Sequence, residues 1–266
     1  MSARHDPVFR RRLISALILG PLAVTLLLLG DLFFTAWVAA FAAAMAWEWI
    51  QMSDKDAPPV AYAIACATAS GAVLLAGQTS IQDALIWGAL GTLGSGVERW
   101  RRGWSVEVLG VLYVSLSAGL LAQMRSTPDH GLAAVILLFS VVWAADSFAY
   151  LVGTWIGGPK LVPQASPNKT WSGFLAGLAA GILAGWVAGR IFGLNDMAVL
   201  IFGGVVATAS VAGDLAMSLF KRGFGVKDSG ALIPGHGGVL DRVDALMLAV
   251  IAAVLVDRSL TLGWAA

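Results

Sequence analysis

The sequence predicts an all-α integral membrane protein, a polytopic bundle of about nine transmembrane helices. Of its 266 residues, 58% are hydrophobic and only 12% are charged, and the mean hydropathy is +0.80. A soluble domain has about 25% charged residues and needs enough polar side chains to cover its surface. The composition therefore excludes a soluble enzyme, a disordered chain and a nucleic-acid-binding protein with a basic surface.

Nine apolar runs come close to the roughly 20 residues that cross a bilayer. Three arginines, Arg10, Arg11 and Arg12, precede the first run, and Pro21 is expected to bend it. The fourth run is the weakest, because it is short and rich in glycine. We expect spans at 13–30, 32–50, 60–77, 82–97, 105–123, 132–153, 172–193, 197–219 and 245–262.

The basic residues divide unevenly between the two sides of such a bundle. With nine spans, 14 of the 17 Lys and Arg fall on one side, and only Arg125, Arg190 and Arg258 fall on the other. The side rich in basic residues faces the cytoplasm. We therefore expect a multi-pass protein of the bacterial cytoplasmic (inner) membrane, with its N-terminus inside and its C-terminus outside. Residues 1–130 form the N-terminal spans and residues 131–266 the C-terminal spans of one integrated bundle.

Two cytoplasmic loops are long enough for chemistry, residues 153–171 and residues 221–244. The other connections, including the one that contains Lys55, are interpreted as charged membrane anchors. Glu48 lies between Trp47 and Trp49 near the end of its span, so it is interpreted as a residue of the interfacial belt. Gly173, Gly177 and Gly181 favour close helix packing, either inside the fold or between the subunits of a homodimer.

One predicted helix contains an acidic residue inside an apolar run. At 100° per residue, Asp214, Ser218 and Lys221 fall on one helical face, with Arg222 beside it. An ionisable residue within a span usually faces a water-filled cavity and a partner. This strip is either a structural Asp–Lys pair or part of an active site.

The loop after this helix favours an active site. Its many glycines allow the backbone to approach an anion. Lys227, His236 and Arg242 add hydrogen-bond donors, and Asp228, Asp241 and Asp244 add hard oxygen donors that suit Mg²⁺. Together they are what a magnesium polyphosphate substrate requires.

The same residues form a recognisable signature. Ser218-x-x-Lys221-Arg222, Lys227-Asp228, Pro234-Gly235-His236-Gly237-Gly238 and Asp241-Arg242-x-Asp244 resemble the signature of the phosphatidate cytidylyltransferases, or CDP-diacylglycerol synthases. The resemblance implies that Asp214 and Asp241 bind the catalytic Mg²⁺, and it leaves a second cation open. It further implies catalytic roles for Lys221 and His236 and substrate binding by Ser218, Arg222, Lys227, Asp228, Gly237, Gly238 and Arg242.

Two further blocks resemble the same family, residues 146–150 and residues 166–171. They add Asp146, Ser166 and Lys169 to the implied substrate-binding residues. The second block precedes a helix, whose N-terminal amides attract anions. For Thr170 the alternative is a plain helix N-cap.

The resemblance implies that CTP and phosphatidate, a membrane lipid, are converted to CDP-diacylglycerol and pyrophosphate. The arrangement of residues agrees with this reaction, since the lipid needs a membrane cavity and the nucleotide needs a polar cytoplasmic entrance. Two alternatives remain, a CTP-dependent lipid-alcohol kinase and an ion-coupled transporter that uses Asp146 and Asp214.

Overall fold

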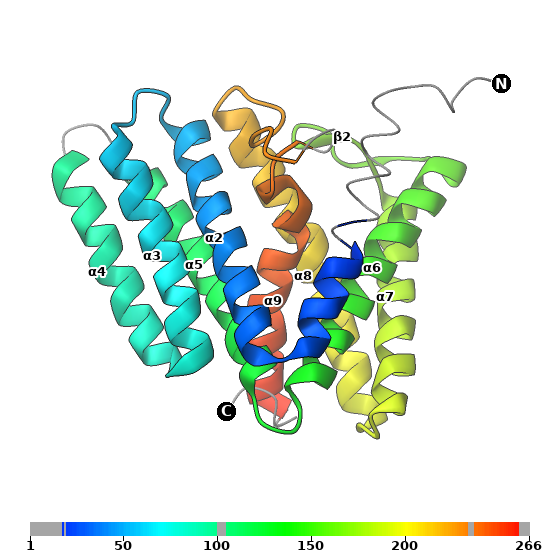
Figure 1. Ribbon diagram of the computed structural model, residues 1–266. Coiled ribbons are helices and arrows are strands. Elements are labelled where there is room, and N and C mark those ends of the chain that lie inside the picture. Colours follow the sequence, from blue (N-terminus) through cyan, green and yellow to red (C-terminus); the bar gives the residue numbers. More distant parts are fainter. Residues whose placement is uncertain (1–17, 19, 100–104, 234–236, 261–266) are drawn as a thin grey trace. The chain divides into compact units, whose positions relative to one another are not determined.

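The computed structural model describes residue 18 and residues 20–99, 105–233 and 237–260. A first apolar helix covers Gly20–Leu29. It is followed by α2 (Asp31–Ser53), α3 (Pro59–Gln78), α4 (Ile81–Arg99), α5 (Ser105–Ser126) and α6 (Gly131–Ile156). A short hairpin of β1 (Lys160–Val162) and β2 (Ser166–Thr170) leads into α7 (Trp171–Ile191), α8 (Asp196–Gly223) and α9 (Leu240–Leu260), as Figure 1 shows.

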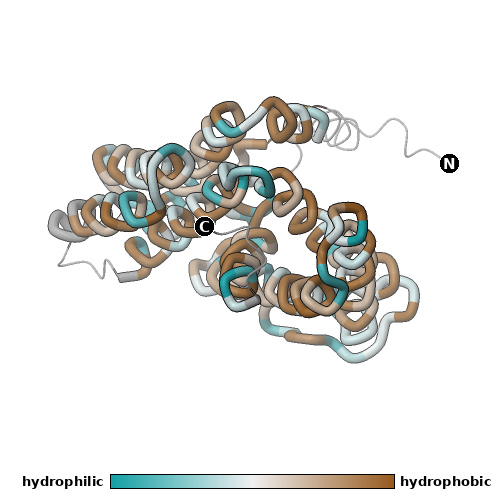
Figure 2. Tube along the Cα trace, turned by 90° about the horizontal axis from the view of Figure 1, so that it is seen from below, coloured by the Kyte–Doolittle hydropathy of each residue, from teal (hydrophilic) through white to brown (hydrophobic). Residues whose placement is uncertain are grey.

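The predicted helical membrane bundle is confirmed, and each predicted span overlaps a described helix. Within the described residues, six helices are long and apolar enough to cross a membrane: α2, α3, α5, α6, α7 and α8. Hydrophobic residues dominate most helical turns in Figure 2. The helices α4 and α9 are outside this group. Glycines and polar residues lower the hydropathy of α4, and α9 carries charged residues at both ends.

The chain forms two compact units, each of which is described by itself. The first contains Met1–Gln123 and Val226–Val243, and the second contains Met124–Gly225 and Asp244–Ala266. In the first unit, α3 packs against both α2 and α4. Trp49 of α2 lies over Gly110 of α5, where a side chain would overlap the indole ring, and its Nε1 donates to the Val106 carbonyl at 3.2 Å.

In the second unit, α7 packs against α6 and α8 through glycines spaced four residues apart. A Cβ atom at Gly177 would lie 2.6 Å from the carbonyl oxygen of Ala145 on α6. A Cβ atom at Gly181 would lie 2.8 Å from the Cβ atom of Ala207 on α8. The stripe predicted to pack either inside the fold or between subunits is therefore used inside the fold.

The hairpin between α6 and α7 is the one sheet in the described residues, where the sequence predicted only a loop. The antiparallel strands pair Lys160 with Thr170 and Val162 with Ser166. Strands of three and five residues are too short to produce a clear alternation of polar and apolar residues. The hairpin ends at Thr170, the N-cap of α7, whose Oγ1 accepts a hydrogen bond from the Gly173 amide at 3.2 Å.

The close contact of α6 and α7 predicts that Gly177→Ala destabilises the protein. The added methyl group meets a backbone oxygen, so the helices must separate, at a cost of about 1–3 kcal/mol. We expect the melting temperature in detergent to fall by several degrees. Gly204→Ala on α8 is the control, because its Cβ atom would meet Ile182 at an ordinary 3.8 Å. Equal melting temperatures for the two variants would contradict this packing.

Candidate active site

The polar strip predicted on α8 is present. The Ser218 hydroxyl donates to Asp214 Oδ1 at 3.3 Å, one helical turn away. Both residues are half-buried, and Lys221 is buried at the next turn. The shared face follows from the spacing of three and four residues in an α-helix, so this prediction is confirmed.

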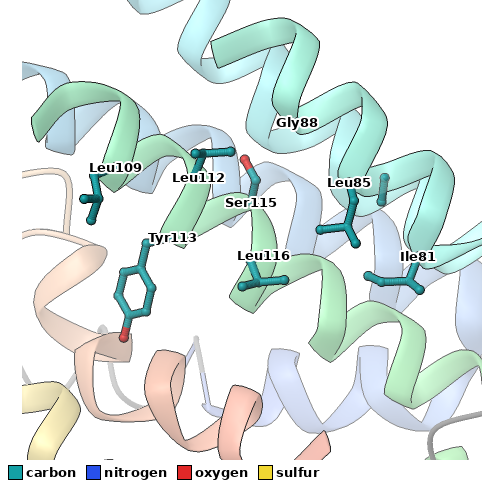
Figure 3. A pocket seen from close by; sticks show the side chains of 9 residues that line it. Ile81, Leu85, Gly88, Leu109, Leu112, Tyr113, Ser115 and Leu116 are labelled. Atoms are coloured by element: carbon teal, nitrogen blue, oxygen red, sulfur yellow. The ribbon is translucent and has the colours of Figure 1, made fainter. Parts of the chain in front are cut away.

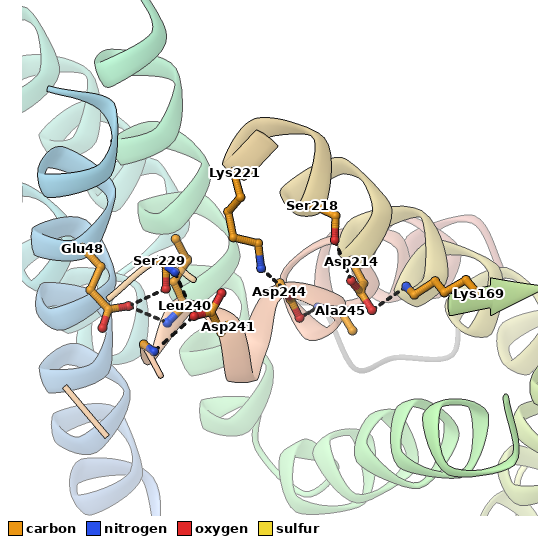
Figure 4. A network of polar contacts seen from close by, with 11 residues as sticks. Glu48, Lys169, Asp214, Ser218, Lys221, Ser229, Leu240, Asp241, Asp244 and Ala245 are labelled. Carbon is orange, nitrogen blue, oxygen red and sulfur yellow. Dashed lines mark hydrogen bonds and ion pairs between the residues drawn. The ribbon is translucent and has the colours of Figure 1, made fainter. Parts of the chain in front are cut away.

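The partner of Asp214 comes from the hairpin. Lys169 on β2 forms an ion pair with Asp214 Oδ2, and these side chains are 27% and 30% exposed (Figure 4). The next residue, Thr170, caps α7 and fixes where the strand ends. Thr170 therefore caps the helix as the alternative expected. The structure also brings Lys169 of the second sequence block to the acidic residue on α8.

Lys221 pairs with another carboxylate of the second unit. Its Nζ lies 3.6 Å from Asp244 Oδ2 on α9, and both side chains are nearly buried, at 11% and 13% exposure. Asp244 Oδ1 also accepts the amide of Ala245 at 2.8 Å. The sequence pattern identified Asp244 only as an oxygen donor of the loop, because no local spacing relates it to Lys221.

The second unit therefore gathers three carboxylates and two ammonium groups. Asp214 repels both Asp146 on α6 and Asp244, while Lys169 attracts these two carboxylates. Ionisable side chains within apolar helices usually pair with one another or face a water-filled cavity, and they mark a candidate functional site.

In the first unit, Asp241 organises the glycine-rich loop. Its Oδ2 accepts the amides of Ser229 at 2.9 Å and Gly238 at 3.1 Å (Figure 4). Asp241 lies in the first turn of α9, and Gly237 before it has a φ of 83°, a conformation that favours glycine. The residue predicted to bind metal thus also closes the loop onto the start of α9.

Glu48 is a residue that sequence analysis interpreted wrongly. It is completely buried rather than part of an interfacial belt, because α2 continues to Ser53 and places Glu48 inside the helix. Its Oε1 accepts the Val239 amide at 2.9 Å, and its Oε2 accepts the Leu240 amide at 2.9 Å and the Ser229 hydroxyl at 3.0 Å. The signal that could have identified it is a lone acidic residue in an apolar span; the flanking tryptophans suggested otherwise.

Two loop glycines are required by the packing around this carboxylate. A Cβ atom at Gly230 would lie 2.7 Å from Glu48 Oε1. One at Gly238 would lie 2.1 Å from the Ser229 hydroxyl and 2.5 Å from Glu48 Oε2. In this structure these glycines leave room for Glu48; the approach of a ligand to them stays a prediction.

A polar pocket of about 520 Å³ lies beside the loop in the first unit. Lys55 and Tyr62 line it together with Asp228 and Gly230 of the loop. Lys55, which the sequence places in a charged connection, thus also lines this pocket. Asp228, one of the predicted substrate-binding residues, is exposed at this pocket.

A second pocket, of about 360 Å³, lies between α4 and α5 (Figure 3). Leu85, Leu109 and Leu112 are among the side chains that line it, and its polar groups come from Tyr113 and Ser115. None of these lining residues, all within the described chain, is charged. The pocket therefore suits hydrocarbon and not a nucleotide.

The remaining predicted site residues differ in exposure. Arg222, Lys227 and Arg242 are exposed, whereas Ser166 is half-buried at the start of β2. His236 lies outside the described residues. Asp214 and Asp241 belong to the two separately described units, so their joint binding of a metal stays a prediction.

The carboxylates of the predicted site suit a hard metal ion such as Mg²⁺. Among the described residues, no group of three or more His, Cys, Asp or Glu side chains could form a closed metal site. Mg²⁺ in nucleotide-dependent enzymes is typically held by one or two carboxylates, substrate phosphates and water. Carboxylates such as Asp214 and Asp241 fit this type of binding.

Known proteins are similar to this sequence over nearly its full length. Residues 10–260 match the model of the cytidylyltransferase family. A protein of Brucella abortus named phosphatidate cytidylyltransferase is 37% identical over 244 residues, which cover 90% of this chain and 89% of the relative. Proteins of the same name from Pseudomonas aeruginosa and Haemophilus influenzae are 37% and 32% identical, covering 91% of this chain and 94% and 96% of the relatives.

Proposed function

This chain belongs to the cytidylyltransferase family, and from this we propose that it is a phosphatidate cytidylyltransferase of phospholipid biosynthesis. It converts CTP and phosphatidate to CDP-diacylglycerol and pyrophosphate within the membrane. The observation that supports this most strongly is the ionic cluster of Lys169, Asp214 and Lys221 on otherwise apolar helices. A reaction between a membrane lipid and a charged nucleotide requires such a polar group of residues inside an apolar bundle.

In the proposed reaction, a phosphate oxygen of phosphatidate attacks the α-phosphorus of CTP. A new P–O–P bond forms, the bond between the α- and β-phosphates breaks, and pyrophosphate leaves. Both reactants are polyanions, so the main barrier that the protein can lower is their mutual repulsion. Lys169 and Lys221, with Arg222 and Lys227, supply positive charge for the phosphates. When bound, Mg²⁺ would neutralise phosphate charge further, with Asp214 and Asp241 as its proposed ligands.

The products of the purified protein test this function. With CTP, Mg²⁺ and phosphatidate, we expect CDP-diacylglycerol and pyrophosphate in equal amounts. In a parallel reaction with a lipid alcohol in place of phosphatidate, formation of CDP and the phosphorylated alcohol would indicate a lipid kinase. No product from CTP in either reaction would favour a transporter. Omission of phosphatidate is the control, and pyrophosphate should then be absent.

The proposed metal ligands predict that Asp214→Asn and Asp241→Asn each lower turnover by at least about 100-fold, the scale for losing one preorganised electrostatic contact. An amide is a weaker ligand for Mg²⁺ than an ionised carboxylate. The matched control is Asp196→Asn at the start of α8, whose exposed pair with Arg190 should matter little. Turnover is measured at limiting Mg²⁺, after each variant is shown to insert normally. Near-normal turnover in both variants would remove these residues from the site.

We also propose nine spans in the bacterial inner membrane, with the first helix (Gly20–Leu29), α4 and α9 crossing in addition to the six apolar helices. The 14-to-3 division of basic residues supports a cytoplasmic N-terminus and an outer C-terminus. Alkaline phosphatase, which is active only outside, should therefore be active when fused after Ala266. An inactive fusion, together with an active cytoplasmic reporter at the same position, would show that the number of spans is wrong.

A further inference from the structure

The start of α9 lacks a side-chain cap of its own. The first amides of any helix have no partner within the helix, and together they carry partial positive charge. A Ser, Thr, Asp or Asn just before the helix usually accepts one of these hydrogen bonds. In this chain the residue before α9 is Val239, which has no acceptor in its side chain.

Glu48 of α2 supplies the missing acceptors from 191 residues away in the sequence. Each of its two carboxylate oxygens accepts one amide at this helix start, from Val239 and Leu240, at 2.9 Å. The residue is 0% exposed. A carboxylate completely removed from water is retained only where hydrogen bonds compensate its lost hydration, and these amides and a hydroxyl provide them.

Glu48 and Asp241 are joined through two loop segments. Ser229 donates its hydroxyl to Glu48 and its amide to Asp241. In the second segment, the Gly238 amide donates to Asp241, and the adjacent Val239 amide donates to Glu48. Both segments are therefore held between the two carboxylates, and a displacement of Glu48 must move Asp241.

We propose that Glu48 is a positioning residue of the active site: it holds the start of α9 and the loop segments at Ser229 and Gly238 so that Asp241 is in place for the metal and the nucleotide. Glu48 acts through the backbone and touches neither ligand. This inference rests on the proposed function for its catalytic consequence, whereas the positioning itself can be measured without any substrate.

The Glu48→Gln variant tests the role of the carboxylate. In glutamine an NH₂ group replaces one of the two carboxylate oxygens and faces a backbone amide or hydroxyl that also donates. At least one hydrogen bond is therefore lost, and the negative charge at the helix start disappears. Residues that orient ligands through a second layer of contacts typically change metal affinity or activity by about 10–100-fold. We expect a change of this size, mostly as a higher requirement for Mg²⁺ and CTP.

Hydrogen–deuterium exchange provides a readout that does not depend on activity. In the full chain in lipid nanodiscs, without nucleotide or metal, the amides of residues 229 and 238–240 should exchange at least tenfold faster in Glu48→Gln than in the original protein. Asp83→Asn is the matched control in the same unit, because this exposed carboxylate accepts hydrogen bonds only from Ser80 next to its own helix. Its exchange at 229 and 238–240 should be unchanged.

Two further variants keep the test decisive. Glu48→Asp preserves the charge and should restore part of the protection and of the Mg²⁺ affinity. If Glu48→Gln does not fold, Ser229→Ala removes one link between the carboxylates and should give the same changes at smaller size.

Unchanged exchange in Glu48→Gln, or in Ser229→Ala where that variant replaces it, would overturn the proposal. So would faster exchange with an unaltered dependence on Mg²⁺ and CTP. If the original protein makes no CDP-diacylglycerol, the proposed function fails, but the exchange data still decide whether Glu48 holds the loop.

Discussion

The interior of a lipid bilayer offers no water to a charged group, so a carboxylate on an apolar helix must find its donors within the protein. Two such carboxylates determine where the polar residues of this molecule lie. Asp214 on α8 requires a cation, which draws the hairpin residue Lys169 to the helix. Glu48 on α2 requires hydrogen-bond donors, and the loop before α9 folds so that its amides provide them. The two polar loops are thus placed by the charge requirements of residues inside the helices.

The glycines of this chain allow close contacts of two kinds. On α7 they let helices approach until a side chain would meet a backbone oxygen, as at Gly177. In the loop, Gly230 and Gly238 leave space for the Glu48 carboxylate and the Ser229 hydroxyl. Both uses depend on the absence of a Cβ atom, but the first brings hydrophobic helices together and the second lets a buried charge reach the backbone.

The sequence was informative where a local pattern determines the structure. Apolar runs of near-constant length located the helices, and the spacing of Asp214 and Ser218 placed both on one face. It was uninformative where residues distant in the chain meet. No local pattern relates Glu48 to Val239, or Lys169 to Asp214, because these contacts depend on how the helices pack. The belt interpretation of Glu48 failed for this reason: its tryptophan neighbours are consistent with the membrane interface, but one of them, Trp49, is buried against α5.

A signature residue can have a structural role beside the role that its motif implies. Asp241 resembles a metal ligand, yet its Oδ2 already accepts two loop amides. Replacement by alanine would remove both functions at once, so lost activity would not separate metal binding from loop structure. Asparagine keeps one carbonyl oxygen that can accept the same two amides while it removes the negative charge. Since the hydrogen bonds of the loop need an acceptor and a metal needs a charge, the two roles of this residue differ in their chemistry and can be separated by substitution.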